Sequence, residues 1–371
     1  MNRIRKFIDN GILLTPSVYE EIKDMEEDSV KELLESDDLF LEDFSLDEDK
    51  GSKGDHISEE FESTLRVIKK AEKASGKYKI SQFVDYYNNR FSRLKEILKK
   101  RVDSKNLISI NKLSSYGLEG TIIGIVREIT GDYVLVEDNT SSVKVDTNEK
   151  LIEDEVIGIR GKKGKEKFVA DKIYYPDLSF KRNVNTLEED QNALFISDLN
   201  SENIKKIRDV IGENNVKYLF IAGEIGLEDM NDLKETLNEI EGMWVSEERK
   251  NIDNGIDRLL VSNNPGWCEV SGEMTILQYL GHNFDEYEKK LGVDTSRDLT
   301  LKLLKKRHLD PLGKNYFDDP FLLDQLPDII HCGNLNDFSV YNYKGTTVVN
   351  TTPEKCVLVN FGNREIEEVD I

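Results

Sequence analysis

The stretch ALFISDLN, residues 193–200, is an apolar run that ends on a carboxylate, Asp198. Such a run predicts a buried parallel strand whose last residue brings Asp198 to the C-terminal edge of a sheet, where α/β folds place their sites. Two later stretches have the same design: residues 216–224 end in Gly-Glu, and residues 327–336 end in Gly-Asn-Leu-Asn. We therefore predict that three strand ends converge on one edge and form a site.

The residues at these strand ends resemble the signatures of calcineurin-like metallophosphoesterases. Residues 198–200 resemble D-x-H, residues 223–224 resemble G-D, and residues 333–336 resemble G-H-x-H. Each metal-binding His of these signatures is Asn in this chain, and the bridging Asp is Glu224. The fourth family position, a His within Tyr-His-Gly, corresponds to Leu280. The resemblance thus assigns six vestigial positions to the metal site: Asp198, Asn200, Glu224, Leu280, Asn334 and Asn336.

The chemistry of that family requires imidazoles that this chain lacks. Two metal ions about 3.5–4 Å apart need a bridging carboxylate and neutral imidazoles to produce an attacking hydroxide. The chain has four histidines, none of them at a ligand position: His56, His282, His308 and His331. The family's G-N-H-D signature is missing, and residues 244–250 are the corresponding stretch. We expect no catalytic residues, no bound metal and no cofactor, although a single weak Mg²⁺ at Asp198 and Glu224 stays open as an alternative.

Three further stretches resemble the small subunits of archaeal family-D DNA polymerases: residues 303–311 (LLKKRHLDP), 326–330 (LPDII) and 343–351 (YKGTTVVNT). The resemblance covers nearly the whole chain and implies an OB-fold followed by a phosphoesterase domain. It further implies a DNA replication protein that forms a tight heterodimer with the large catalytic subunit. The small subunit of that family is a 3′-to-5′ exonuclease, so a chain without the metal ligands would be a non-catalytic accessory subunit, a pseudoenzyme.

Composition limits the partners of the chain. Its net charge is −22, with 73 acidic and 51 basic residues. A protein that neutralises DNA phosphates usually presents a basic surface, so we expect DNA contacts to be local or to be made mainly through the complex. A salt-adapted cytoplasm would also explain such acidity. A sliding clamp is a further candidate partner, and a membrane is not expected because no apolar run approaches the ~20 residues of a membrane span.

The three cysteines, Cys268, Cys332 and Cys356, lack C-x-x-C spacing. An odd number of cysteines without this spacing argues against a zinc site or a disulfide framework and for small buried thiols in a reducing compartment. The chain also starts without a charged and apolar leader followed by a cleavage site. We therefore expect a cytoplasmic protein.

Changes in pattern along the chain predict a multidomain fold with a five-stranded OB-fold β-barrel and an α/β calcineurin-like phosphoesterase domain. The helical segment combines two helices, over 61–74 and 78–101. The predicted parts are a small helical N-terminal module (1–42), an acidic flexible linker (43–60), a helical segment (61–104), the OB-fold (105–178) and the phosphoesterase domain (190–371).

Two features leave nucleic-acid binding open. The aromatic cluster Tyr86, Tyr87 and Phe91 could stack on bases, although packing against the next domain is favoured. The basic loop 160–165 of the barrel could contact a single strand, although the barrel has few aromatic residues, which favours a barrel that docks on its neighbour. The alternatives to the accessory subunit are thus an active phosphodiesterase or exonuclease with an unusual metal set, and a stand-alone single-stranded-DNA-binding protein.

Overall fold

The computed structural model describes residues 13–14, 40–41, 63–69, 71, 80–179, 182–226, 234, 240–246, 258–314, 316 and 318–371. The chain divides into two units, Met1–Phe61 and Glu62–Ile371. In the first unit, β1 (Leu13–Leu14) pairs in parallel with β2 (Phe40–Leu41). The rest of the predicted N-terminal module, the predicted linker and His56 lie outside the described residues.

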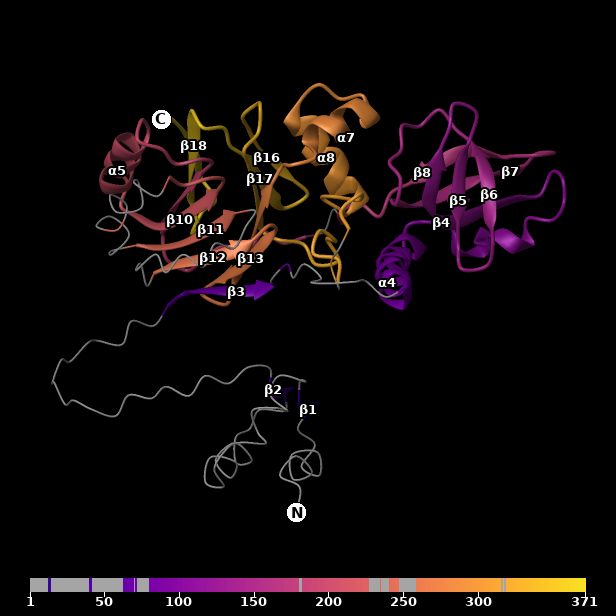
Figure 1. The fold of residues 1–371 in the computed structure, drawn as a ribbon, viewed down its shortest axis with the longest axis horizontal. Helices are drawn as coiled ribbons and strands as arrows, with labels where there is room; N and C mark the ends of the chain where they lie inside the picture. The colour runs from indigo at the N-terminus through magenta and orange to yellow at the C-terminus, as the bar shows by residue number, and fades with distance from the viewer. Residues whose placement is uncertain are drawn as a thin grey trace, which may run out of the picture. The chain divides into compact units, whose positions relative to one another are not determined.

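The second unit contains a closed barrel of five strands (Figure 1). The strands are β4 (Glu119–Ile129), β5 (Val134–Glu137), β6 (Ser142–Asp146), β7 (Val156–Lys163) and β8 (Phe168–Tyr174). They close in the order β4-β5-β6-β8-β7, and β6 runs parallel to β8 while the other pairs are antiparallel. Apolar side chains such as Val136, Val145 and Phe168 fill the interior. This order and closure are those of an OB-fold, so the predicted barrel is confirmed.

Two six-stranded sheets pack face to face in the α/β domain. The sheet named here the β9 sheet has the order β12 (Leu259–Asn263), β11 (Glu241–Ser246), β10 (Val216–Ala222), β9 (Asn192–Ile196), β18 (Lys355–Asn360) and β19 (Ile366–Asp370). The β15 sheet has the order β16 (Ser339–Tyr343), β17 (Thr346–Asn350), β15 (Ile329–Gly333), β14 (Met274–Leu280), β13 (Gly266–Val270) and β3 (Leu65–Lys69).

The alternation of side chains along a strand explains how one apolar run contributes to two hydrophobic cores. In β9, Ala193 and Phe195 face the β15 sheet, whereas Leu194 and Ile196 face the opposite way. Helix α5 (Ile204–Glu213) covers the outer face of the β9 sheet. Helices α7 (Phe284–Leu291) and α8 (Ser296–Lys306) pack against the outer face of the β15 sheet. The central strands β9, β10 and β15 are therefore buried on both faces, as a run of consecutive apolar residues requires.

One segment differs from its prediction. The helix predicted over 61–74 is wrong: residues Leu65–Lys69 form strand β3, which pairs antiparallel with β13. The buried carboxylate of Glu241 fixes the start of β3, because it accepts hydrogen bonds from the backbone N–H groups of Thr64 (3.0 Å) and Leu65 (3.0 Å). Pairing with a strand about 200 residues further along the chain thus overrides the local helical pattern. The second predicted helix, over 78–101, is present as α4 (Ile80–Lys99).

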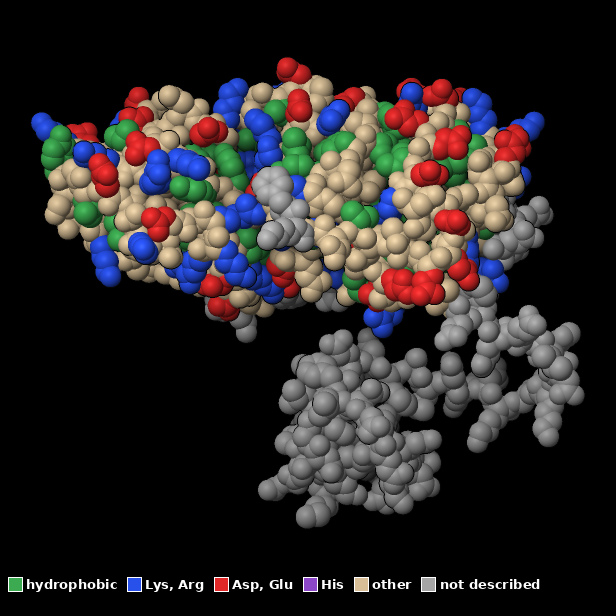
Figure 2. All heavy atoms as spheres, turned by 180° about the vertical axis from the view of Figure 1, so that it is seen from behind, with side chains coloured by type: hydrophobic (Ala, Val, Ile, Leu, Met, Phe, Trp, Pro, Cys, Tyr) green, Lys and Arg blue, Asp and Glu red, His purple; other side chains and the backbone are tan. Residues whose placement is uncertain are grey.

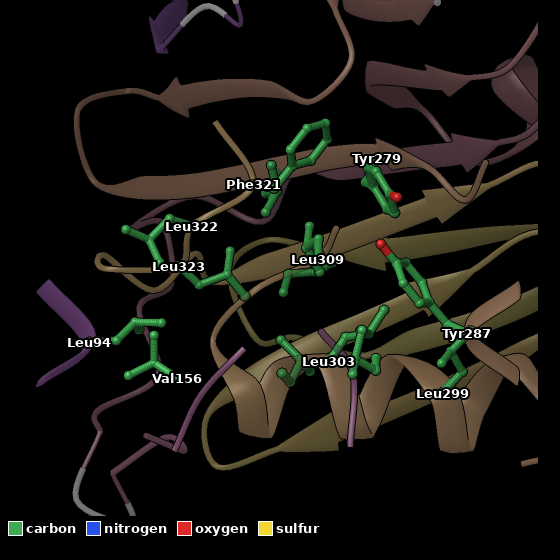
Figure 3. Close-up of a cluster of buried hydrophobic side chains, with 14 of the residues drawn as sticks. Leu94, Val156, Tyr279, Tyr287, Leu299, Leu303, Leu309, Phe321, Leu322 and Leu323 are labelled. Carbon is green, nitrogen blue, oxygen red and sulfur yellow. The ribbon is translucent and has the colours of Figure 1, made fainter. Parts of the chain in front are cut away.

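A single apolar cluster joins α4, the barrel and the α/β domain (Figure 3). Leu94 comes from α4, Val156 from the barrel, and Leu303 from α8. The aromatic residues of α4 belong to the same cluster, and Tyr86, Tyr87 and Phe91 are each less than a tenth exposed: Tyr86 3%, Tyr87 7% and Phe91 4%. The prediction that these rings pack against a neighbouring domain is confirmed, and so is the docking of the barrel.

A buried ionic network lies in the same region. Arg90 of α4 is fully buried, and its Nε lies 2.6 Å from Asp319 Oδ2, which also contacts His308 Nε2 at 2.8 Å. The remaining guanidinium N–H groups donate to the carbonyl oxygens of Pro311 (2.6 Å) and Asp154 (3.3 Å) and to the hydroxyl of Tyr86 (2.8 Å). Burial alone would raise the pKa of Asp319, but His308 and Arg90 together hold that pKa well below its usual value.

Charged side chains are unevenly distributed on the surface. Figure 2 shows Lys and Arg side chains gathered towards the middle of one face and a group of Asp and Glu side chains at its lower right. A net charge of −22 is therefore compatible with local basic regions on the surface. Within the described part of the chain, no helix is both long and apolar enough to cross a membrane.

Candidate functional site

The carboxyl ends of β9, β10 and β15 meet at one edge of the α/β domain. The backbone N–H of Asn334, just after β15, donates to Ser197 Oγ, just after β9, at 2.8 Å. A Cβ atom on Gly333 would lie 1.9 Å from the carbonyl oxygen of Ala222 at the end of β10, so this position requires glycine. The three strand ends converge as predicted, but the third comes from the facing sheet and not from the same sheet edge.

Asp198 connects the ends of β9 and β10. Its Oδ1 accepts a hydrogen bond of 2.6 Å from the backbone N–H of Glu224, and a Cβ atom on Gly223 would lie 2.2 Å from the same oxygen. The indole N–H of Trp244 donates to the carbonyl oxygen of Gly223 at 2.8 Å and fixes this turn from the β11 side. One oxygen of the carboxylate is therefore occupied in holding the strand ends together.

Asn200 takes part in the turn that begins α5. Its Oδ1 accepts from the backbone N–H groups of Glu202 (2.9 Å) and Asn203 (3.1 Å), and Asn203 Oδ1 accepts from the N–H of Asn200 (3.0 Å). The side chain of Asn203 also donates to the carbonyl oxygen of Asp198 at 3.0 Å. The side-chain oxygen of Asn200, the atom that would face a metal, is thus used by the backbone.

The other polar positions lie at the surface. Glu224, Asn334 and Asn336 are exposed. Asn334 has a φ of 60°, a left-handed conformation that Asn adopts more readily than most residues. The amide of Asn336 donates to Asp285 Oδ1 of α7 at 3.2 Å. Asn336 is therefore directed towards a neighbouring helix by its hydrogen bond.

Leu280 is part of the core between the two sheets and is 2% exposed. Asn264 fixes its backbone: Asn264 Oδ1 accepts from the N–H of Leu280 at 3.0 Å, and Asn264 Nδ2 donates to the carbonyl oxygen of Leu280 at 3.5 Å. Leu280, the position that the resemblance assigned to a family histidine, is thus a packing residue in this structure. Asn264 was not identified from the sequence, because its partner is 16 residues away and no spacing signal joins them.

The side chains of the buried histidines are hydrogen bonded within the core. His331 of β15 makes hydrogen bonds with Gln278 Nε2 through Nδ1 (3.2 Å) and with Thr351 Oγ1 through Nε2 (2.9 Å). Burial lowers the pKa of His331 to about 3, so the ring is neutral at physiological pH. Burial also lowers the pKa of His308. Both rings are satisfied within the core, and His282, next to Leu280, is exposed.

Over the described ranges, no group of three or more His, Cys, Asp or Glu side chains is placed so that it could hold a metal ion. Residues 247–250, which complete the stretch corresponding to the third signature, lie outside those ranges. The three cysteines are buried and free, in agreement with the predicted reduced thiols.

No protein-family model matches the chain. The chain is similar to proteins named DNA polymerase II small subunit. The relative from Archaeoglobus fulgidus is 25% identical over 363 residues, which cover 78% of this chain and 73% of the relative. The relative from Methanothermobacter thermautotrophicus is 25% identical over 352 residues (73% and 72%), and that from Thermoplasma acidophilum is 21% identical over 423 aligned positions (94% and 85%).

Among solved structures, an archaeal phosphodiesterase matches 49% of this chain and 100% of its own, with a TM-score of 0.35 and 10% identity. A chain of the Stn1–Ten1 complex of S. pombe matches 19% of this chain and 75% of its own, with a TM-score of 0.17 and 24% identity.

Proposed function

The chain is a homologue of the small subunits of archaeal DNA polymerase II, the family-D polymerase, and on this premise we propose that it is a non-catalytic accessory subunit of that enzyme. The similarity extends over 78% of the chain, a share too large to lie within the barrel or the α/β domain alone. The chain would hold and position the large catalytic subunit during DNA replication inside the cell.

The absence of catalysis is supported by the chemistry of the strand-end residues. A pair of metal ions needs several imidazole and carboxylate ligands that are free to coordinate. Leu280 offers no donor atom, and Asn200 uses its side-chain oxygen in the turn before α5. Asp198 and Glu224 are the carboxylates at these positions, and one oxygen of Asp198 is already hydrogen bonded. The residues do not fit the two metal ions of an active phosphoesterase.

A folded domain whose site lacks these ligands would act through its surface. The large catalytic subunit of the same polymerase is the proposed partner. DNA would be contacted mainly within the complex, because a free chain with a net charge of −22 attracts few phosphates over most of its surface.

The test uses the full chain produced with and without the large subunit from the same genome. Expected results are a single complex on size-exclusion chromatography and no release of nucleotides from a 3′-labelled oligonucleotide by the isolated chain in Mn²⁺. Two separate peaks would contradict the accessory role.

The Asp198→Asn variant is the control for nuclease activity. Nucleotide release that requires Mn²⁺ and is lost in Asp198→Asn would show an active site and overturn the non-catalytic assignment. Release that is equal in both proteins would come from a contaminating nuclease and would leave the assignment supported.

A further inference from the structure

A cavity of about 350 Å³ lies between a loop of the barrel and α8. Its charged side chains are mostly lysines, which is unusual in a chain with this excess of acidic residues. The residues that matter for the argument are Lys150, Lys302, Lys305, Lys306, Tyr175 and Glu149. Four ammonium groups therefore share the lining with one carboxylate.

Lys306 forms one wall of the cavity and is already paired. Its side chain is 3% exposed and makes an ion pair with the buried carboxylate of Glu155 in the barrel. Its Nζ also lies 4.6 Å from the centre of the Tyr175 ring. Burial lowers the pKa of Lys306 although Glu155 opposes this effect, so an added anion would favour its charged form.

The other three lysines have no carboxylate partner in the described part of the chain. Lys302 Nζ donates to the carbonyl oxygen of Leu291 at 3.1 Å, at the end of α7. Lys150, on the barrel loop, is exposed, and Lys305 is half-buried. The exposed side chain of Glu149 is the one carboxylate in the lining that faces these three charges.

Stabilisation of the α8 dipole explains only part of this arrangement. Lysines in the last turn of a helix interact favourably with its negative end, which accounts for Lys305 and Lys306. Lys302 lies one turn earlier and donates to the end of α7 instead. The α8 dipole does not account for Lys150, which reaches the same cavity from the barrel and whose Nζ lies beside Gly292 at the end of α7. Two separate parts of the fold thus bring ammonium groups together around one space.

We propose that this cavity is a binding site for a phosphate group, held by Lys150, Lys302 and Lys305. The volume lies near the lower end of the range of small-molecule sites, about 300–1,000 Å³, so it would accommodate one or two phosphates. Ammonium groups bind phosphate as point charges without a demanding geometry. The phosphate would come either from a nucleic-acid backbone or from a free phosphorylated compound, and this inference does not depend on the proposed subunit role.

The experiment compares two probes on the full chain. Anisotropy of a labelled oligothymidylate is measured at several salt concentrations, and pyrophosphate binding is measured by calorimetry. The Lys150→Glu/Lys305→Glu variant removes one lysine from each side of the cavity and leaves the buried Lys306 pair intact. The control variant, Lys205→Glu/Lys206→Glu, makes the same change in net charge at two exposed residues of α5.

We expect the cavity variant to weaken binding about tenfold or more and the control variant about twofold or less. For the oligonucleotide, the slope of log K against log salt should fall by about 1.4, or about 0.7 for each lost contact with a single strand. Binding of the oligonucleotide with competition by pyrophosphate identifies a backbone phosphate, and binding of pyrophosphate alone identifies a free compound. Equal losses in both variants, or no binding of either probe, would overturn the site.

Discussion

The Asp319→Asn substitution tests the buried network that joins α4 to the α/β domain. The carboxylate of Asp319 accepts from Arg90 Nε at 2.6 Å, contacts His308 Nε2 at 2.8 Å and accepts from the N–H of Phe321 at 3.3 Å. Asparagine keeps the size of the side chain but removes its charge and one acceptor oxygen. Arg90 would then remain buried as a cation without its counter-ion.

The loss of stability expected for Asp319→Asn follows from the burial of both side chains of the ion pair. The side chains of Arg90 and Asp319 are 0% and 1% exposed, so solvent cannot replace the lost partner. Removing one member of such a pair costs about 3–5 kcal/mol. Asp318→Asn is the matched control: the same substitution one residue earlier affects an ion pair with Arg93 whose side chains are 37% and 54% exposed. Exposed pairs contribute about 0–1 kcal/mol.

Urea unfolding measures the difference in stability between the Asp319→Asn and Asp318→Asn variants. Trp244 and Trp267, the two tryptophans of the chain, both lie in the α/β domain and report its unfolding by fluorescence. The free energy of unfolding is obtained by linear extrapolation for each protein. We expect Asp319→Asn to lose at least about 3 kcal/mol and Asp318→Asn less than about 1 kcal/mol. Equal losses in the two variants would refute the argument from burial.

Three further predictions concern other buried groups. The pKa of His331 is about 3 in the fold and about 6.5 when unfolded, so the unfolded chain binds more protons and stability is lost as pH falls below about 6.5. Between pH 7 and 5 this loss should be about 2 kcal/mol, and urea unfolding of His331→Gln should show a correspondingly smaller decrease. Gly333→Ala should shift the strand ends and lower the melting temperature, because the added Cβ would lie 1.9 Å from the Ala222 carbonyl oxygen; an unchanged melting temperature would contradict this contact. Glu241→Gln should weaken the anchoring of β3, which would increase amide hydrogen exchange in Leu65–Lys69 more than in the barrel, and uniform exchange would count against it.

The strand-end site could be predicted because its signals are local. Each of the three strands is a short apolar run that ends on polar residues. Parallel pairing brings the ends of β9 and β10 to one sheet edge, and the face-to-face packing of the two sheets brings the end of β15 beside them. The barrel was predicted for the same reason, since turn residues separate its strands. An N-cap pattern at Asn203, just before the apolar face of α5, would also have identified its role in the turn.

Long-range contacts account for what the sequence did not predict. Strand β3 is a short segment, LRVIK, within a stretch of charged residues, and its pairing with β13 and its hydrogen bonds to Glu241 hold it as a strand. The burial of Arg90 likewise depends on Asp319, which lies 229 residues away along the chain. The sequence around β3 and around Arg90 contains no periodic pattern that would indicate Glu241 or Asp319 as a partner.

The position of β3 has a consequence for synthesis on the ribosome. The strand ends at Lys69, and its partner β13 begins at Gly266, so the 196 residues from 70 to 265 are made between the two. At about 5–20 residues per second, β3 waits roughly 10–40 s for its neighbour while the barrel is already emerging. In sequence the barrel is therefore an insertion between β3 and the rest of the α/β domain, and β3 can join its sheet only after most of the polypeptide has left the exit tunnel.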